Sequence, residues 1–497
     1  MSDDAINDLK PGAYSRRRFI KMAAMAAAAL PAGSALLAAC GDTATVAPTA
    51  AAAASSAAMT TSAAVATTAA MTTTAAAGAA TTTAAAALPN PPTVPNAAAA
   101  KAFASQSIKF YGDAVGSGAD LDSTVAAQFT KDTGIKVTLL PRPDSSTDYY
   151  TALQRLFQGS SSEVDVMMLD VIWPGAFAQS LLDLTPKLGS LSSGYYDTAI
   201  QNNTVKGKLV AMPYFGDFGM LYYRTDLLQK YGFAKPPETW DELTTQAKKI
   251  QDGEKATNPN FAGFTFQGKT YEGLTCDALE WIASSGGGTI IDASGKVTIN
   301  NDKAAAALTR AKGWVGTISP TGVTAYDEAG ALDPFLQGNV AFLRNWPYAY
   351  AQGQDATKSK IVGKFDVAPL PHDVGEKSSG TLGGWQIGVN KNSKNQDAAI
   401  EFARYLTSKE LQTYRGIVGG YVPLHKDAAT DPAVLKAAPY LTNLANVVRV
   451  PRPSTATGIN YNDVSTTFFQ GVGKILQGQD AKTVLADVQK RIESALQ

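Results

Sequence analysis

The 497-residue sequence contains only two cysteines and two histidines, and it carries no excess of either charge. With 43 basic and 43 acidic residues, it lacks the basic excess that is typical of nucleic-acid-binding proteins. His372 and His425 lie about 50 residues apart, so the sequence does not favour a histidine-based metal site or a Ser/His/Asp triad. Cys40 and Cys276 are too few for a disulfide framework. We therefore expect no metal, no cofactor and no nucleic-acid partner.

The sequence also lacks the short motifs that mark common catalytic sites. It has no G-x-S-x-G, H-E-x-x-H or C-x-x-C pattern and no Walker-type loop. Cys276 lies in the apolar helical pattern "YEGLTCDALEWI", which is typical of a buried structural thiol. Carboxylates are plentiful, so a glycosidase that uses two of them remains an alternative.

Charged residues are absent between Thr43 and Ala100, where the chain is rich in Ala and Thr. Ahead of this tract, "SRRRFIK" (15–21) is followed by a weakly hydrophobic run that ends in "LAAC" (37–40). The order resembles a twin-arginine export signal with a lipobox, which implies removal of residues 1–39 and a lipid on Cys40. An ordinary signal peptide that ends near a cysteine is the alternative. We expect residues 40–104 to form a disordered tether.

Strand and helix patterns alternate from about residue 105. The strand candidates "IKFYG", "IKVTLLP" and "VDVMMLD" are separated by helical patterns, which favours a parallel α/β layer structure. Such sheets bind ligands at the carboxyl ends of their strands, so Asp113, Arg142 and Asp170 are candidate site residues. After residue 211 the same rhythm suggests a second α/β lobe, in which Thr239 and Glu242 fit a capping box.

Aromatic residues recur beside Gly, Pro and polar residues in loop-like positions. An aromatic ring can pack on the apolar face of a sugar, while carboxylates or Arg pair with its hydroxyls. We therefore take these clusters as a candidate sugar site. Its members are Asp170 and Trp173 in "DVIWPG", Phe215 and Asp217 in "YFGDFG", Arg344, Trp346 and Tyr348 in "RNWPY", and Trp385 in "LGGWQ". The remaining tryptophans, at 240, 281 and 314, lie in amphipathic helix patterns and are expected to pack in the core.

Four longer stretches carry a family resemblance: "GMLYYRTDLLQKYG", "PPETWDEL", "FLQGNVAFLRNWPYAY" and "AAIEFARYLTS". They resemble the extracellular solute-binding proteins of ABC sugar importers, the family that includes maltose-binding protein. The resemblance covers nearly everything from about residue 105 to 497. "RNWPY", "GGWQIG" and "PRPSTATGINYNDVSTTFF" are most similar to the trehalose- and maltose-binding members.

The resemblance implies a two-lobed periplasmic-binding-protein fold, with the ligand cleft at a hinge of crossing strands between the lobes. The crossings are expected near residues 214–219, 344–348 and 386–389. Residues 105–215 and 346–388 would then form lobe 1. Residues 216–345 and 389–497, including the C-terminal helices, would form lobe 2.

The family pattern also implies roles for individual residues. Asp170 would bind sugar hydroxyls, and Trp346 with Tyr348 would stack on the sugar. The other matched positions are Asp217, Glu328, Gly384, Trp385 and Arg452, with Arg142 as a weaker match and Asp113 as a candidate at the poorly aligned start of the domain. Phe215 departs from the pattern, because relatives often have a hydroxyl-bearing Tyr there, and this leaves the identity of the sugar open.

Together these features predict a lipid-anchored receptor on the extracytoplasmic face of the cytoplasmic membrane. It would bind an α-linked disaccharide such as trehalose or a maltose-like sugar and pass it to the transmembrane subunits of an ABC permease. We expect a monomer that is not an enzyme. The alternatives are a secreted glycan-processing enzyme, a receptor for a non-sugar solute and a structural surface protein.

Overall fold

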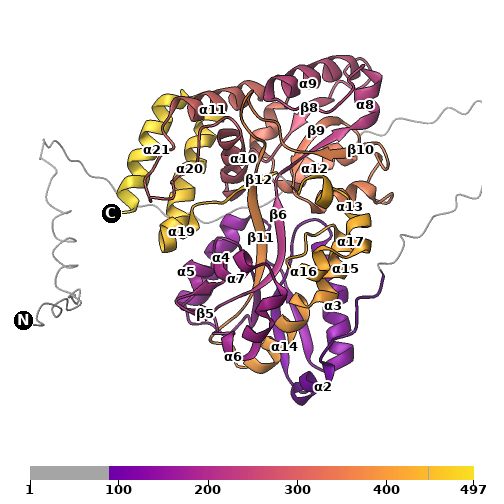
Figure 1. Cartoon of the computed structure of the whole chain (residues 1–497), viewed down its shortest axis with the longest axis vertical. Helices are drawn as coiled ribbons and strands as arrows, with labels where there is room; N and C mark the ends of the chain where they lie inside the picture. The colour runs from indigo at the N-terminus through magenta and orange to yellow at the C-terminus, as the bar shows by residue number, and fades with distance from the viewer. Residues whose placement is uncertain (1–88, 446) are drawn as a thin grey trace, which may run out of the picture. The chain divides into compact units, whose positions relative to one another are not determined.

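The computed structural model describes residues 89–445 and 447–497, which fold around two main β-sheets (Figure 1). The predicted signal peptide, Cys40 and the tether as far as residue 88 lie outside the described residues. The first sheet has six strands, in the order β12-β11-β3-β1-β2 with β6 on β11. These strands are β1 (Ser107–Tyr111), β2 (Lys136–Leu140), β3 (Val166–Asp170), β6 (Met212–Phe218), β11 (Ser379–Val389) and β12 (Val448–Val450).

Helices cover both faces of the first sheet, as an α/β layer structure requires. β1, β2 and β3 are mutually parallel, as predicted, whereas β11 runs antiparallel to β3 and β6. Helices α3 and α14 pack on one face through Phe129 and Phe402, and α4 and α5 pack on the other through Leu153 and Phe177. The helices of this lobe are α2 (Ala97–Ala100), α3 (Gly118–Thr133), α4 (Ser146–Gln158), α5 (Pro174–Phe177), α6 (Thr185–Leu188), α7 (Asp197–Asn202), α14 (Gln396–Thr407), α15 (Lys409–Gly419), α16 (Lys426–Ala429), α17 (Pro432–Ala437) and α18 (Tyr440–Asn443), with the small strand pair β4 (Thr204–Val205) and β5 (Lys208–Leu209).

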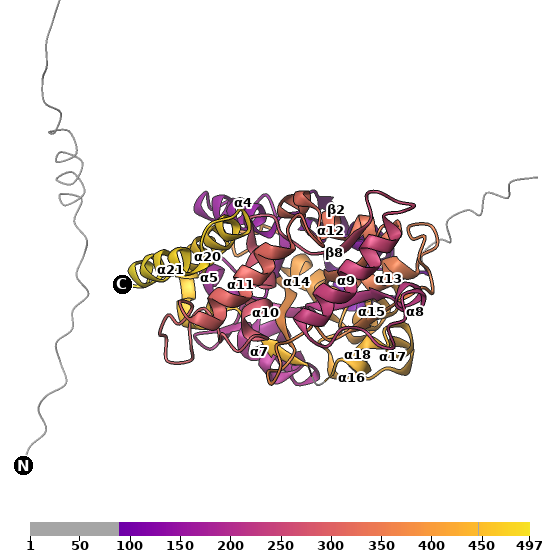
Figure 2. The same ribbon diagram turned by 90° about the horizontal axis from the view of Figure 1, so that it is seen from above.

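The second sheet has four strands in the order β10-β7-β9-β8. They are β7 (Met220–Arg224), β8 (Ala262–Thr265), β9 (Val340–Asn345) and β10 (Phe365–Ala368). Figure 2 looks onto this lobe from above. Its helices are α8 (Thr225–Lys230), α9 (Trp240–Glu254), α10 (Glu272–Ala283), α11 (Asp302–Trp314), α12 (Glu328–Leu336), α13 (Tyr348–Gln354), α20 (Tyr461–Leu476) and α21 (Ala481–Ala495). Trp240, Trp281 and Trp314 are buried against one another in this lobe, which confirms the prediction that they pack in the core.

The chain passes between the two sheets three times among the described residues. The first passage is at Gly219, between β6 and β7, and agrees with the predicted crossing at 214–219. The second runs through residues 369–378, between β10 and β11, and the third runs from β12 through residues 451–453 to α19 (Ser454–Thr457) and α20. The predicted crossings at 344–348 and 386–389 are wrong. Residues 346–347 turn the chain into α13 of the same lobe, and residues 386–389 lie in β11, paired with β3.

Two predicted lobe boundaries change for the same reason. β10 pairs with β7, so residues 365–368 belong to the second sheet and not to lobe 1. α14 packs on β11, β6 and α3, so residues 396–407 belong to the first lobe and not to lobe 2. The C-terminal helices α20 and α21 pack on α10 and α11 of the second lobe, as expected.

The last part of the predicted tether is folded. Residues 89–103, which we call the strap, lie against α3, α14 and α15 of the first lobe. Tyr414 and Tyr405 donate their hydroxyl protons to the backbone oxygens of Pro89 (2.8 Å) and Pro92 (2.6 Å). The backbone N–H of Val94 donates to Asp132 Oδ2 (2.9 Å). The strap is held through its backbone, so an Ala-rich composition does not prevent it from ordering.

Removing the strap should destabilise the folded chain. Deletion loses three hydrogen bonds and the burial of Val94 and Ala100, which together stabilise by about 3 kcal/mol. A chain that begins at Ser105 should therefore melt below one that begins at Pro89, measured by circular dichroism. Equal melting temperatures would contradict the contribution of the strap, and a chain with Tyr405→Phe and Tyr414→Phe should lie between the two.

A capping box in the second lobe was predicted from the sequence. Thr239 and Glu242 form the predicted capping box at the start of α9: the Thr239 side chain accepts from the Glu242 N–H, and the Glu242 carboxylate accepts from the Thr239 N–H. Within the described ranges, no helix has the length and apolarity needed to cross a membrane.

Candidate functional site

A cavity of about 670 Å³, including space that opens to solvent, lies between the two sheets. Residues from both lobes and from the third passage line it. They are Asp113, Val115, Asp144, Ser146, Asp170, Phe215, Asp217, Gly383, Gly384, Trp385 and Tyr421 of the first lobe, Glu272, Gly273, Cys276, Glu328, Trp346 and Tyr348 of the second, and Arg452.

Ten of the thirteen predicted sugar-site residues line this cavity, and Arg142, Trp173 and Arg344 do not. The parallel strands explain part of this agreement. β1 and β3 are neighbours in the sheet, so Asp113 and Asp170, which follow or end them, lie at the same edge. The remaining members come together only through the fold, because they are spread over residues 215–452.

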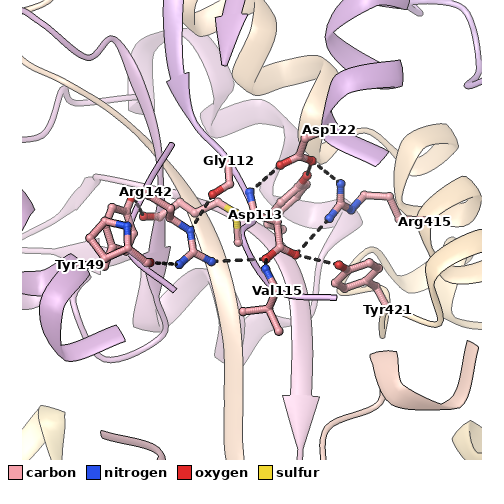
Figure 3. A network of polar contacts seen from close by, with 11 residues as sticks. Gly112, Asp113, Val115, Asp122, Arg142, Tyr149, Arg415 and Tyr421 are labelled. Atoms are coloured by element: carbon pink, nitrogen blue, oxygen red, sulfur yellow. Dashed lines mark hydrogen bonds and ion pairs between the residues drawn. The ribbon is translucent and has the colours of Figure 1, made fainter. Parts of the chain in front are cut away.

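Asp113 is held by a polar network on the first-lobe side of the cavity (Figure 3). Its carboxylate accepts hydrogen bonds from Tyr421 (2.7 Å) and from Arg142 Nη2 (3.3 Å). Arg415 lies behind it, with Nη1 donating to Asp122 Oδ1 (2.6 Å) and Nη2 3.8 Å from Asp113 Oδ2. These partners fix the direction of the Asp113 carboxylate before any ligand binds.

Arg452 joins the two lobes at the edge of the cavity. Its guanidinium donates to both oxygens of Asp170 (2.6 and 3.1 Å) and to Glu272 Oε1 (3.0 Å). Burial alone would lower the pKa of Arg452, but the carboxylates of Asp170 and Glu272 raise it well above its ordinary value. Asp170 belongs to β3 and Glu272 to α10, so this ion-pair cluster spans the cleft.

Trp346 and Trp385 supply aromatic walls from opposite lobes. The guanidinium of Arg344 lies 4.0 Å from the ring centroid of Trp346 and covers one side of that ring. Trp385 contacts Arg142 (4.8 Å to the ring centroid) and the edge of Trp173 (5.7 Å between centroids). Arg142 and Trp173 therefore support Trp385 from outside the cavity wall.

Gly384 adopts a conformation that favours glycine, with φ at +122°. A Cβ atom there would lie 2.6 Å from the backbone oxygen of Phe215, which leaves no room for a side chain. The pairing of β11 with β6 shifts register at the next residue, Trp385, and this bulge accompanies its turn toward the cavity. The two strands therefore approach each other closely at "GGW".

Asp217 and Glu328 differ from Asp113, Asp170 and Glu272, the cavity carboxylates that form ion pairs. Neither forms an ion pair among the described residues, and the Asp217 carboxylate accepts no hydrogen bond from them. Burial raises the pKa of both groups, and the neighbouring charges of Asp113 and Asp170 raise that of Asp217 further. Because no described residue occupies its side chain, Asp217 is available to form hydrogen bonds with hydroxyl groups of a ligand.

Replacing Asp217 with Asn should stabilise the ligand-free protein at neutral pH. A carboxyl group whose pKa is raised in the fold binds its proton more tightly folded than unfolded, so its ionisation lowers the free energy of unfolding as the pH rises from about 4. Asp217→Asn removes this loss, so its melting temperature should exceed that of the wild type at pH 7 and approach it at pH 4.5. Asp487→Asn, on the C-terminal helix, is the matched control. A pH-independent difference for Asp217→Asn would contradict the raised pKa.

Several cavity residues were not predicted as site residues. Tyr421 follows Gly419 and Gly420 as Trp385 follows its two glycines, and this pattern could have identified it. Glu272 and Cys276 lie in the same apolar helical pattern, from which Cys276 was predicted to be a buried structural thiol and no role was predicted for Glu272. Both are buried, as predicted for Cys276, but the start of α10 faces the cavity.

The comparisons with known proteins agree with this architecture. Residues 112–413 match the family model described as "Bacterial extracellular solute-binding protein". The chain is 47% identical over 392 residues to a Deinococcus radiodurans protein described as "Probable ABC transporter-binding protein", covering 78% of this chain and 93% of that one. A solved structure of maltose-bound T. maritima MalE3 is 37% identical, with a TM-score of 0.74 over 78% of this chain and 99% of that chain. A ribitol complex of a solute-binding protein from Agrobacterium radiobacter is 25% identical, with a TM-score of 0.67 over 78% and 98% of the two chains.

Proposed function

This chain belongs to the bacterial extracellular solute-binding protein family, and from that premise we propose that it is the sugar receptor of an ABC importer. Its ligand would be a neutral α-linked disaccharide of the trehalose or maltose type, bound in the cavity between the lobes. The observation that carries this proposal is the convergence of Trp346, Trp385 and the unpaired carboxylate of Asp217 on one cavity. Aromatic faces and hydrogen-bond acceptors are what a hydroxyl-rich ring requires.

The charge of the cavity supports a neutral ligand. Among the described residues, six carboxylates line it, from Asp113, Asp144, Asp170, Asp217, Glu272 and Glu328, and Arg452 is the only cation in the lining. Arg452 is itself occupied by Asp170 and Glu272. A sugar phosphate or a sugar acid would therefore meet repulsion without a free cation to pair with.

The similar proteins support the ligand class at a coarser level. The structures named above hold maltose in one case and ribitol in the other, so a sugar or a polyol is the supported range. The two aromatic walls, which come from opposite lobes, favour a disaccharide over a single small polyol. Phe215 contributes a ring but no hydroxyl to this wall. We include in the proposal that this residue influences the choice between trehalose and maltose.

The cellular location and the membrane anchor of the receptor are proposed from its sequence. Cys40 would carry a lipid at the extracytoplasmic face of the cytoplasmic membrane, and the Ala/Thr-rich segment would tether a monomer close to the transmembrane subunits of its permease. The strap is hydrogen-bonded to Asp132, Tyr405 and Tyr414 of the first lobe. The tether would therefore hold that lobe and leave the second free to close over the sugar.

Calorimetric titration of residues 89–497 against a ligand panel tests the proposal. We expect saturable binding of trehalose or maltose, weaker binding of ribitol, and no binding of maltose 1-phosphate or glucuronate. The sugars should be recovered unaltered, whereas cleaved products would favour the glycan-processing alternative. Binding of a peptide or an amino acid with no binding of any sugar would overturn the sugar assignment while leaving the family intact.

A further inference from the structure

Two of the three interlobe passages meet at a pair of glycines. A Cβ atom at Gly380, at the start of β11, would lie 2.8 Å from the backbone oxygen of Gly219. A Cβ atom at Gly219 would collide with the side chain of Glu280 and lie 2.7 Å from Arg344 Nη2. The first and second passages are therefore packed directly on the ion pair between Glu280 and Arg344.

This ion pair is completely buried, and its neighbours fix its orientation. Arg344 Nε donates to Glu280 Oε2 (2.8 Å), and its Nη1 donates to Gln267 Oε1 (2.6 Å) and lies 3.0 Å from Asp277 Oδ1. Glu280 Oε1 also accepts the backbone N–H of Thr381, in β11, at 3.0 Å. One carboxylate thus holds both the strand of the second passage and the arginine of β9.

The other end of this chain of contacts is the ligand cavity. The guanidinium of Arg344 stacks on Trp346 at 4.0 Å, and Trp346 lines the cavity. The Trp346 ring also lies 3.1 Å from the position that a Cβ atom would take on Gly383, in β11. Arg344 therefore covers one face of the Trp346 ring, and the Cζ3 and Cη2 atoms of the ring lie close to β11.

Helix α10 connects all three passages to the cavity. Its Glu280 contacts the first two, and its Glu272 pairs with Arg452 of the third. Thr381 fastens β11 to the middle of the same helix by donating its hydroxyl proton to the backbone oxygen of Cys276 (2.8 Å). Cys276 and Glu272 line the cavity. A rotation of the passages would therefore shift this helix and the part of the cavity wall that it forms.

We infer that Glu280 and Arg344 are positioning residues that couple the hinge to the ligand site by setting the orientation of Trp346. In the conformation described, Thr381 and Gly219 hold Glu280, Glu280 holds Arg344, and Arg344 supports the ring that would stack on the sugar. A hinge that opens pulls β11 away from Glu280 and loosens this support, so stacking and closure favour each other. The inference rests on the proposed sugar-binding function of the cavity.

Gly219→Ala tests the coupling from the hinge side. The added methyl group displaces Glu280 and Arg344 without touching the cavity, so sugar affinity should fall about 5- to 50-fold, the range typical of coupled sites. If the effect travels through Trp346, it should shrink to about twofold or less when Trp346 is already Leu. Gly313→Ala on α11, where the methyl group meets nothing within 4 Å, should leave affinity unchanged. The same fold loss of affinity in both backgrounds would overturn the inference, because a merely structural defect is additive.

A ligand-free measurement separates this inference from the proposed function. The emission of Trp346, taken as the difference between the wild type and Trp346→Phe, should become more accessible to acrylamide in Gly219→Ala. Glu280→Gln keeps the side-chain shape, weakens the ion pair and should produce the same change if the Ala variant does not fold. If the wild type binds no sugar, the proposed function fails, but acrylamide quenching of Trp346 still tests the coupling. Unchanged acrylamide quenching of Trp346 in both variants would overturn the coupling.

Discussion

Replacing Trp346 with Leu is expected to weaken sugar binding at least 30-fold. A buried tryptophan at the centre of a binding site commonly contributes about 2 kcal/mol or more, which is a factor of about 30 in the dissociation constant. Leu is too short to fill the space between Arg344 and Gly383, so the flat face of the ring is lost. The measurement is calorimetric titration with the tightest sugar of the panel.

Two controls accompany this prediction. Trp346→Phe retains a ring and should recover part of the affinity. Tyr350→Leu removes a neighbouring aromatic side chain that packs on Phe365 and Tyr440 and does not line the cavity, so it should lower stability but change affinity less than about twofold. Equal binding by the wild type and Trp346→Leu would place the ligand elsewhere.

Arg452→Met should produce the largest loss of stability at neutral pH. The substitution leaves Asp170 and Glu272 as neighbouring buried carboxylates without their common cation. Breaking a buried ion pair in this way costs about 3–5 kcal/mol. Burial, with the nearby charge of Asp170, already raises the pKa of Glu272 despite Arg452, and removal of the arginine should raise it further.

The pH dependence gives this prediction a clear sign. With a raised pKa in the fold, Glu272 binds a proton more readily folded than unfolded, so the stability of Arg452→Met should rise as the pH falls from 7 toward 5. Urea unfolding at both pH values measures the difference. Arg491→Met removes the same side chain from an exposed pair with Asp487 and should stay within about 0.5 kcal/mol of the wild type. A loss of that small size for Arg452→Met would contradict the cluster.

The sequence predicts the part of this site that local pattern controls. Asp113 and Asp170 follow from the rule that parallel strands expose their carboxyl ends at one edge, and Gly384 with Trp385 follows from a glycine pair beside an aromatic residue. Arg452 was identified through the family resemblance alone. It lies 282 residues from Asp170, and no local pattern connects the two.

The misassigned segments share a physical reason. The family resemblance implied a crossing at 344–348, but whether the chain leaves the lobe after Pro347 depends on the packing of α13 on its neighbours, which local composition does not encode. Glu272 was missed because a carboxylate in an apolar helix is usually solvent-facing or structural, and only the approach of Arg452 makes it part of the cavity wall. The strap was predicted as part of the tether from its Ala-rich composition. Its hydrogen bonds use backbone atoms, and composition does not reveal such bonds.

The central claim is that one sugar molecule binds between the lobes and contacts both. A crystal structure of residues 89–497 with the tightest sugar of the panel tests it most directly. We expect a sugar ring on the free face of Trp346, a hydroxyl donating to Asp217, and contacts from Trp385 across the cleft. A sugar bound at any other surface, with the cavity between Trp346 and Trp385 empty, would contradict the account.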